Sequence, residues 1–316
     1  MEMLIPVAIL AAAASQSAAP QASPPPTFDA GRPAPDTAPE LALILKRVGE
    51  YVAEYERSFS DLVAEETYAQ RVAPWAWKDD GAQKRFVRVC TVCKRTTRAD
   101  LVFVRLAGEI PWASYRDVFE VDGRKVREHE QRLVKLLSNP SADAQEQARK
   151  LLAASAAYNI GPVKRTVNLP TLPLLFLLPR NQVRFDYRLG GLRMIGTTEA
   201  VELVFRETSR PTFVRGPWDA DLPAQGRFWV NAARAAVVRS EVEFDFGAEA
   251  EARVTTDYRP EPALAMWVPA EMRELFADVP RAKVKTFPAP FKGVARYERF
   301  RRFTVSTEEH VALPPP

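Results

Sequence analysis

Two cysteines, Cys90 and Cys93, form the C-x-x-C spacing "CTVC", the pattern in this sequence most typical of thiol chemistry. A redox pair of this kind normally opens a helix, whose dipole lowers the pKa of the first thiol. The β-branched residues around this pair favour a strand, which would place the two Cα atoms about 10 Å apart. A disulfide allows about 7 Å at most. The pair is therefore either reduced or bridged across a turn at 91–92, and a structural role is favoured over a catalytic one.

Other catalytic and metal-binding patterns are scarce. The two histidines, His129 and His310, are far apart in the sequence, the first in a charged run and the second in the C-terminal tail. Metal sites and catalytic triads need a histidine with partners at fixed geometry. The adjacent Glu65 and Glu66 would point to opposite faces of a strand, and we interpret both as solvated polar residues. The sequence predicts no enzyme activity, no metal site and no cofactor.

The most unusual stretch of the chain is "NLPTLPLLFLLPRNQ", residues 168–182. Thr171 would cap a short helix that has Pro173 near its start and ends at Pro179. The side chains between these prolines are apolar on every side of the helix. Such a segment is either a plug packed into a sheet or a lid over a non-aqueous ligand, and the sequence leaves both alternatives open.

A second apolar surface is expected from the strand at 237–246. From Val238 to Phe246 the even positions are apolar or small, whereas the odd positions carry charges, a pattern typical of a strand with one buried face. The candidate ligand-binding residues are apolar side chains of the 168–182 stretch and of the strands after it: Leu174, Leu175, Phe176, Leu178, Phe205, Phe228, Val242 and Phe244. They would line a cavity for a hydrophobic small molecule, a lipid or a lipoprotein acyl chain. Alternatively, they form the packed core of a structural module that binds an envelope protein through its surface.

The elements that would position these residues are mostly strands. Residues 37–59 begin with a capping box and continue with apolar residues at helical spacing, which predicts an amphipathic helix. Short β-branched and aromatic runs follow, and Asp122-Gly123 predicts a tight hairpin. A helical insert is expected over about 127–182, with its better helix at 141–158.

The second half of the chain returns to strands joined by short turns, and Gly190-Gly191 is expected to be one of these turns. The alternation slips between Arg299 and Arg302, which predicts a β-bulge in the last strand. Because no room is left for βαβ crossovers, the pattern favours an antiparallel meander in one α+β domain.

Composition and the N-terminus indicate where the protein acts. Residues 1–22 resemble a signal peptide with an apolar core too short to span a bilayer, and 23–36 form a Pro/Ala-rich linker before a single domain at 37–310. We therefore expect a periplasmic or secreted protein without a transmembrane span after cleavage. The net charge is +4, with 33 arginines spread along the chain. We interpret them as residues of solvated strand faces and expect no nucleic-acid partner.

Several of these segments resemble known families. "GRFWVNAARAAVVRSEVEF", "VTTDYRPEPALAMWVPAEM" and "ARYERFRRFTV" resemble an uncharacterised secreted protein family of Acidobacteria-like bacteria. The G-x-x-W-[VI]-[ND] hairpin, the D-Y strand and the final F-x-V strand are similar to LolA/LolB-like outer-membrane lipoprotein-sorting proteins. That resemblance implies a curved antiparallel half-barrel, with the N-terminal helix and the helical insert covering one face, and an acyl chain as cargo.

Overall fold

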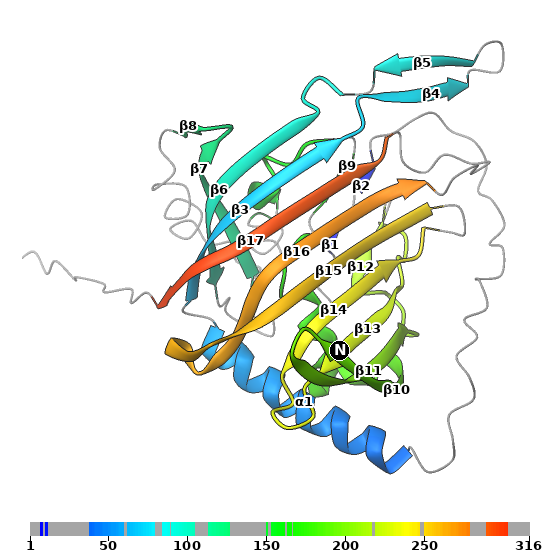
Figure 1. The fold of residues 1–316 in the computed structure, drawn as a ribbon. Helices are drawn as coiled ribbons and strands as arrows, with labels where there is room; N and C mark the ends of the chain where they lie inside the picture. The colour runs from blue at the N-terminus through cyan, green and yellow to red at the C-terminus, as the bar shows by residue number, and fades with distance from the viewer. Residues whose placement is uncertain are drawn as a thin grey trace, which may run out of the picture.

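An antiparallel sheet of 11 strands dominates the computed structural model (Figure 1). The structure describes residues 7–8, 10–11, 38–59, 62–79, 84–88, 90–104, 113–126, 150, 153–161, 163–165, 167–216, 219–246, 250–278 and 289–302. The strands of the main sheet are β3 (Leu62–Val72), β6 (Lys94–Val104), β7 (Ala113–Val121), β8 (Arg124–Lys125), β10 (Phe185–Ile195), β11 (Thr198–Glu207), β13 (Ala224–Val230), β14 (Val237–Phe244), β15 (Ala250–Glu261), β16 (Met266–Asp278) and β17 (Phe291–Arg302).

The remaining elements are short, apart from one helix. They are α1 (Ala38–Phe59), η2 (Leu172–Leu177), α4 (Pro179–Gln182) and η4 (Pro262–Leu264), together with β1 (Val7–Ala8), β2 (Leu10–Ala11), β4 (Trp75–Asp79), β5 (Lys84–Arg88), β9 (Val163–Lys164) and β12 (Val214–Arg215). β4 pairs with β5, β1 pairs with β12 and β2 pairs with β9.

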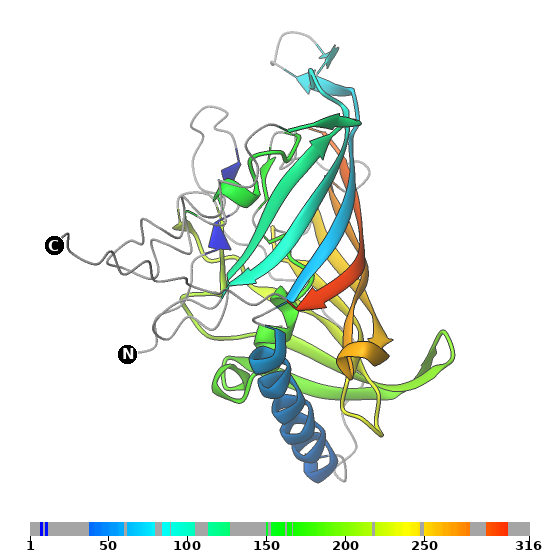
Figure 2. The ribbon, with the colours of Figure 1, turned by 90° about the vertical axis from the view of Figure 1, so that its left-hand side faces the viewer.

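The main sheet is bent and stays open. Its strand order is β10-β11-β13-β14-β15-β16-β17-β3-β6-β7-β8, so that β10 and β8 are its two edges. Most neighbours follow one another in the chain, as expected for a meander. The exception is in the middle of the sheet, where β17 pairs with both β16 and β3. Figure 2 shows the bend of the sheet around an inner, concave side.

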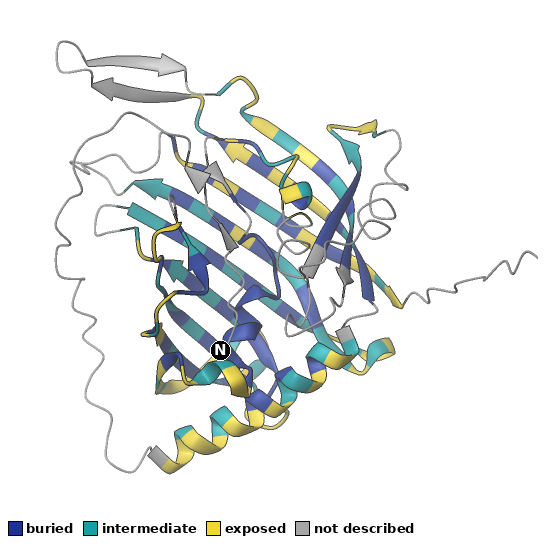
Figure 3. Ribbon diagram, turned by 180° about the vertical axis from the view of Figure 1, so that it is seen from behind, coloured by how far each residue is buried: buried dark blue, intermediate teal, exposed yellow. Residues whose placement is uncertain are grey.

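The two faces of the sheet differ in polarity. On β14 the side chains of Ser240, Val242 and Phe244 are buried, whereas the odd positions between them are half-buried, which confirms the predicted alternation. The same banding is seen on other strands in Figure 3. The opposite, convex face carries cross-strand ion pairs such as Arg98–Glu65 and Arg239–Asp257, each at 2.5 Å. Arginines in these pairs lie on the outward strand face, as predicted.

The predicted N-terminal helix is confirmed as α1, which lies across one end of the sheet (Figures 1 and 2). Val48 and Val52 have no exposed surface and pack into the core, and Tyr51 Oη accepts a hydrogen bond from Trp267 N on β16 at 3.4 Å. The first part of the expected helical insert, residues 127–149, lies outside the described residues. Between 153 and 182 the described residues form only short helical segments instead of a long covering helix.

Three predictions about turns and bulges have different outcomes. Asp122 and Gly123 form the β7–β8 turn with φ values of 50° and 78°, as an Asp-Gly hairpin requires. The last strand has its register shift between Glu298 and Arg301, close to the predicted place. The turn expected at Gly190-Gly191 is wrong: β10 continues through these glycines with a bulge opposite β11, because two adjacent glycines also suit a bulge.

Cys90 and Cys93 are joined by a disulfide between β5 and β6, with their Cα atoms 5.4 Å apart. The chain therefore turns at 91–92 and does not run extended through the pair. The backbone N–H of Val72 donates to Cys93 O at 2.9 Å, which ties this turn to the end of β3. Residues 91–92 are exposed, so the bridge lies at the surface.

Replacing both cysteines with serine is expected to reduce the free energy of unfolding by no more than about 2 kcal/mol, because the bridge closes a very short loop. Urea unfolding of the oxidised protein and of the Cys90→Ser/Cys93→Ser variant measures this difference. A loss well above this limit would contradict a purely local role of the bridge.

In the described part of the chain, no helix has both the length and the hydrophobicity needed to cross a bilayer.

Candidate ligand-binding site

The concave face has an apolar half over β11, β13 and β14. Sheet register places Leu203 of β11 opposite Phe228 of β13, and Phe228 opposite Ser240 of β14. Phe205 lies beside Phe228 with ring centroids 4.8 Å apart. These side chains share one face because residues directly opposite in antiparallel strands point the same way. They form a floor of aromatic and aliphatic groups, called the apolar floor below.

A six-residue 3-10 helix, η2, covers the apolar floor. Its residues, Leu-Pro-Leu-Leu-Phe-Leu, are all buried. The ring of Phe176 lies 4.8 Å from Phe185, 5.7 Å from Phe205 and 5.4 Å from Phe213, measured between centroids. We refer to residues 171–178 as the plug. The predicted cap is wrong in one respect: Thr171 precedes the helix, but its side chain makes no capping hydrogen bond.

Side chains from neighbouring elements bind the carbonyl groups of the plug. Tyr187 Oη donates to Phe176 O at 2.8 Å, Asn181 Nδ2 donates to Leu175 O at 2.8 Å, and Gln182 Nε2 donates to the carbonyl oxygen of residue 177 at 2.8 Å. Among the described residues, no backbone hydrogen bond joins the plug to a strand of the sheet. The plug is therefore held against the apolar floor by side-chain packing.

All eight residues predicted to bind a ligand belong to one hydrophobic cluster. Their exposed fractions lie between 0 and 7%. Leu174, Leu175, Phe176 and Leu178 belong to the plug, and Phe205, Phe228, Val242 and Phe244 to strands of the floor. With so little accessible surface, the two groups contact each other, so any ligand at this place must separate the plug from the floor.

The other half of the concave face is polar and was missed by the sequence analysis. Glu66 of β3 is fully buried and binds Arg116 of β7, whose side chain is 2% exposed. Arg116 Nη2 donates to Glu66 Oε1 at 2.8 Å. The interpretation of Glu66 as a solvated residue was therefore wrong. The neighbouring Glu65 does face outward, where it pairs with Arg98 and Arg299 on the convex side.

A second buried ion pair lies on the same half. Arg165 Nε is 3.2 Å from Glu274 Oε2, and Tyr68 Oη donates to Glu274 Oε1 at 2.7 Å. Burial raises the pKa of Glu274 above its ordinary value, although Arg165 and Tyr68 oppose the increase. Burial also raises the pKa of Tyr68, and the negative charge of the Glu274 carboxylate raises it further. At neutral pH the tyrosine therefore keeps its proton and acts as the donor.

The polar half is covered by the segment that leads into the plug. Gln70 Nε2 donates to Tyr158 O at 3.2 Å, and Ile160 N donates to Gln70 Oε1 at 3.0 Å. Arg116 Nη2 donates to Asn168 O at 3.0 Å. We refer to the described residues of 153–178 as the strap. Polar bonds hold its first part to the sheet, and apolar packing holds the plug at its end.

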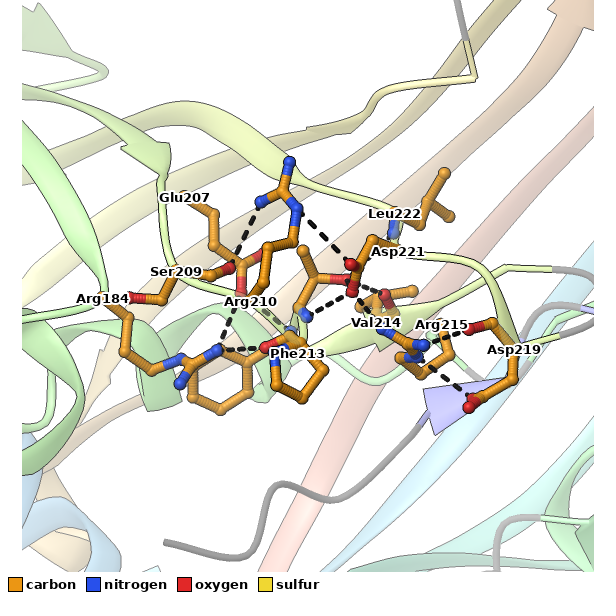
Figure 4. A network of polar contacts seen from close by, with 12 residues as sticks. Arg184, Glu207, Ser209, Arg210, Phe213, Val214, Arg215, Asp219, Asp221 and Leu222 are labelled. Carbon is orange, nitrogen blue, oxygen red and sulfur yellow. Dashed lines mark hydrogen bonds and ion pairs between the residues drawn. The ribbon is translucent and has the colours of Figure 1, made fainter.

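A polar network beyond the plug positions one of its aromatic neighbours (Figure 4). The carboxylate of Glu207 accepts the backbone N–H groups of Phe213 at 2.8 Å and of Ala224 at 3.2 Å. Burial raises the pKa of Glu207, whereas these N–H groups and Arg184 oppose the increase. Arg184 and Arg215 point into this network and pair with carboxylates. The network fixes the Phe213 ring against Phe176.

Neither histidine lies in the described part of the chain. Among the described residues, no group of three or more His, Cys, Asp or Glu side chains could hold a metal ion. The concave face offers a large apolar surface next to a buried, charge-balanced polar cluster, an arrangement suited to holding an amphiphilic molecule.

Comparison with known proteins gives structural likenesses only. No protein-family model matches the chain, and no curated protein matches it. Similar solved structures include a domain described as an outer membrane lipoprotein-sorting protein from Vibrio parahaemolyticus. It is 10% identical in sequence with a TM-score of 0.39, and the likeness covers 84% of this chain and 95% of that domain's chain. A LolA superfamily protein from Nitrosomonas europaea is 11% identical in sequence and has a TM-score of 0.34. The likeness covers 83% of this chain and 99% of that protein's chain. A DUF1329 family protein from Desulfovibrio piger is 10% identical and also has a TM-score of 0.34. Here the likeness covers 85% of this chain and 95% of that protein's chain. Likenesses this distant do not decide the function.

Proposed function

We propose that this chain is a non-catalytic binding protein for a hydrophobic ligand, a lipid or an acyl chain, that acts in the periplasm or after secretion. In this proposal residues 1–22 are a signal peptide that is removed. The ligand takes the place of the plug on the apolar floor. Of the eight predicted residues, the four in the plug are displaced and the four on the strands bind the ligand. Phe205, Phe228, Val242 and Phe244 then contact the ligand.

The observation that supports this proposal is the way in which the plug is held on the apolar floor. Beyond Thr171 the plug has no polar side chains and lies on an aromatic floor, and packing holds it there without backbone hydrogen bonds to the described strands of the sheet. It thus occupies the position of an apolar ligand and contacts the floor through the same kind of surface. A segment held in this way can leave without breaking the hydrogen bonds that define the sheet.

The energies of the plug and of an acyl chain are comparable. Burying the six Leu and Phe side chains of the plug at about 2 kcal/mol each is worth about 12 kcal/mol. A saturated chain of about 16 carbons would gain about 12 kcal/mol at about 0.8 kcal/mol per methylene. The exchange is therefore nearly balanced for one chain and becomes favourable for longer or multiple chains. Affinity should increase about fourfold for each added methylene.

Titration of the delipidated protein with fluorescent fatty acids of increasing length tests the proposal. Binding should strengthen steeply with chain length, and Phe244→Glu should weaken it at least about 100-fold, because a carboxylate on the apolar floor must be desolvated by the ligand. Val183→Glu is the matched control, since Val183 is 80% exposed just after the plug, and this variant should bind like the parent. Affinities are normalised to the folded fraction measured by circular dichroism.

The alternative function is a structural or envelope-assembly module with a permanently packed interior. The small exposed fractions of the eight predicted residues favour it. Native mass spectrometry separates the two functions: the delipidated protein should take up lipid under the first, and should stay empty at every lipid concentration under the second.

A further inference from the structure

The guanidinium of Arg165 lies in a cage of groups that bind cations. Its Nε is 3.2 Å from Glu274 Oε2, and its Nη2 donates to Gln70 Oε1 at 3.1 Å. Its Nη1 donates to Ile160 O at 2.9 Å, and its Cζ lies 3.4 Å from the centroid of the Phe291 ring. A carboxylate, neutral oxygens and an aromatic face are the groups that recognise guanidinium and alkylammonium ions.

The sheet holds most of this cage in place. Glu274 on β16 is opposite Gly293 on β17, and Gly293 is opposite Gln70 on β3, so the three form one row across neighbouring strands. Glycine leaves the middle of the row open: a Cβ at 293 would lie only 2.9 Å from the Tyr68 ring. Tyr68 in turn orients the carboxylate of Glu274. These groups would stay in position if the strap moved.

Arg165 and Ile160 belong to the strap, not to the sheet. Displacing the strap would remove the guanidinium and one carbonyl oxygen, and Glu274 would lose its nearest cation. When the bound ligand covers this half in place of the strap, a buried carboxylate without a cation is strongly unfavourable, because it then lacks both water and a counter-ion. The strap can therefore leave readily only if another cation enters the cage.

We infer that the cage of Glu274, Gln70 and Phe291 binds a guanidinium or alkylammonium group of the ligand, which replaces Arg165 when the strap is displaced. This inference rests on the proposed function and makes a cationic amphiphile the preferred ligand. A fatty acid binds the apolar floor through its chain alone, because an anionic headgroup gains nothing from the cage. Without Arg165, the ion-paired charges described on this half are Glu66, Arg116 and Glu274, with carboxylates in excess.

Chemical rescue tests the cage by itself. Arg165→Ala is expected to lower the melting temperature by about 10 °C, and millimolar ethylguanidinium should restore at least half of that loss. Ethylurea has a similar shape but no charge and should restore nothing, as should sodium chloride at equal ionic strength. The rescue should disappear in Arg165→Ala/Glu274→Gln. Equal rescue by ethylurea, or rescue that survives Glu274→Gln, would overturn the inference. If Arg165→Ala does not fold alone, its refolding yield with each additive gives the same comparison.

Binding to the intact chain separates the cage from the proposed function. Dodecylguanidinium should bind at least about tenfold more tightly than dodecylurea, a difference of about 1.4 kcal/mol, and Glu274→Gln should abolish this preference. Equal binding of the two probes would overturn the cationic ligand and leave hydrophobic binding standing. If neither probe binds while ethylguanidinium still rescues Arg165→Ala, the cage exists and the proposed function fails.

Discussion

Replacing Glu66 with alanine is expected to lower the free energy of unfolding by about 3–5 kcal/mol. The change leaves the guanidinium of Arg116 inside the protein without its carboxylate. The side chain of Arg116 is 2% exposed, so water cannot take over the lost hydrogen bonds. Of the acceptors described for this side chain, only Asn168 O would remain. Urea unfolding followed by circular dichroism measures the change.

The adjacent residue is a matched control. Glu65 is a carboxylate on the same strand, but its partners Arg98 and Arg299 lie on the convex face, with side chains 37% and 70% exposed. Glu65→Ala should cost no more than about 1 kcal/mol. A double replacement, Glu66→Leu with Arg116→Met, should regain much of the loss, because apolar pairs often substitute well for buried ion pairs. Equal losses for Glu65→Ala and Glu66→Ala would contradict the assignment of the two faces.

The second large effect is expected at the centre of the plug. Phe176→Ala should lower the free energy of unfolding by about 3–5 kcal/mol, since Phe176 has no exposed surface and contacts three other phenylalanine rings. The same change weakens the competitor for the apolar floor. Binding of a fluorescent fatty acid should therefore become tighter by tenfold or more, although the protein is less stable.

These opposite signs make Phe176→Ala informative. If the core is permanently packed, Phe176→Ala loses stability and binds no fatty acid. If the ligand instead binds to the plug, with Leu175 and Phe176 in its binding surface, Phe176→Ala should lower both the affinity for the ligand and the stability. Thermal unfolding and ligand titration of the same preparation distinguish these outcomes. Val183→Ala, at an exposed position after α4, should change neither quantity.

Side-chain alternation explains why much of the sheet was predictable. The period-two pattern at 237–246 correctly assigned the two faces of β14, because a strand must place alternate residues on opposite sides. The same rule placed Glu65 and Glu66 on different faces. It could not say that the inward residue was Glu66, since both are carboxylates and the local sequence around them is similar.

The polar cluster was unpredictable for a different reason. Glu274 and Gly293 lie on consecutive strands, but Gln70 joins them through the pairing of β17 with β3, which are more than 200 residues apart in the chain. Local periodicity contains no information about which distant strands become neighbours. A buried carboxylate also looks like a solvated one in sequence, because its partner, here Arg165 of the strap, is supplied by another element. An unusually polar inward face on β3, with Glu66, Tyr68 and Gln70 at every second position, is the signal that could have pointed to it.

The position of β17 has a consequence for how the chain folds. Strand β17 lies between β16 and β3, so among the described strands it is the one that joins the two halves of the main sheet. Pairing Phe291 with Val72 closes a loop of more than 200 residues, and loop closure of that length slows folding. Until β17 has been synthesised, β3 and β16 are left as two unprotected edges. A nascent chain therefore cannot complete the main sheet before β17 has been made.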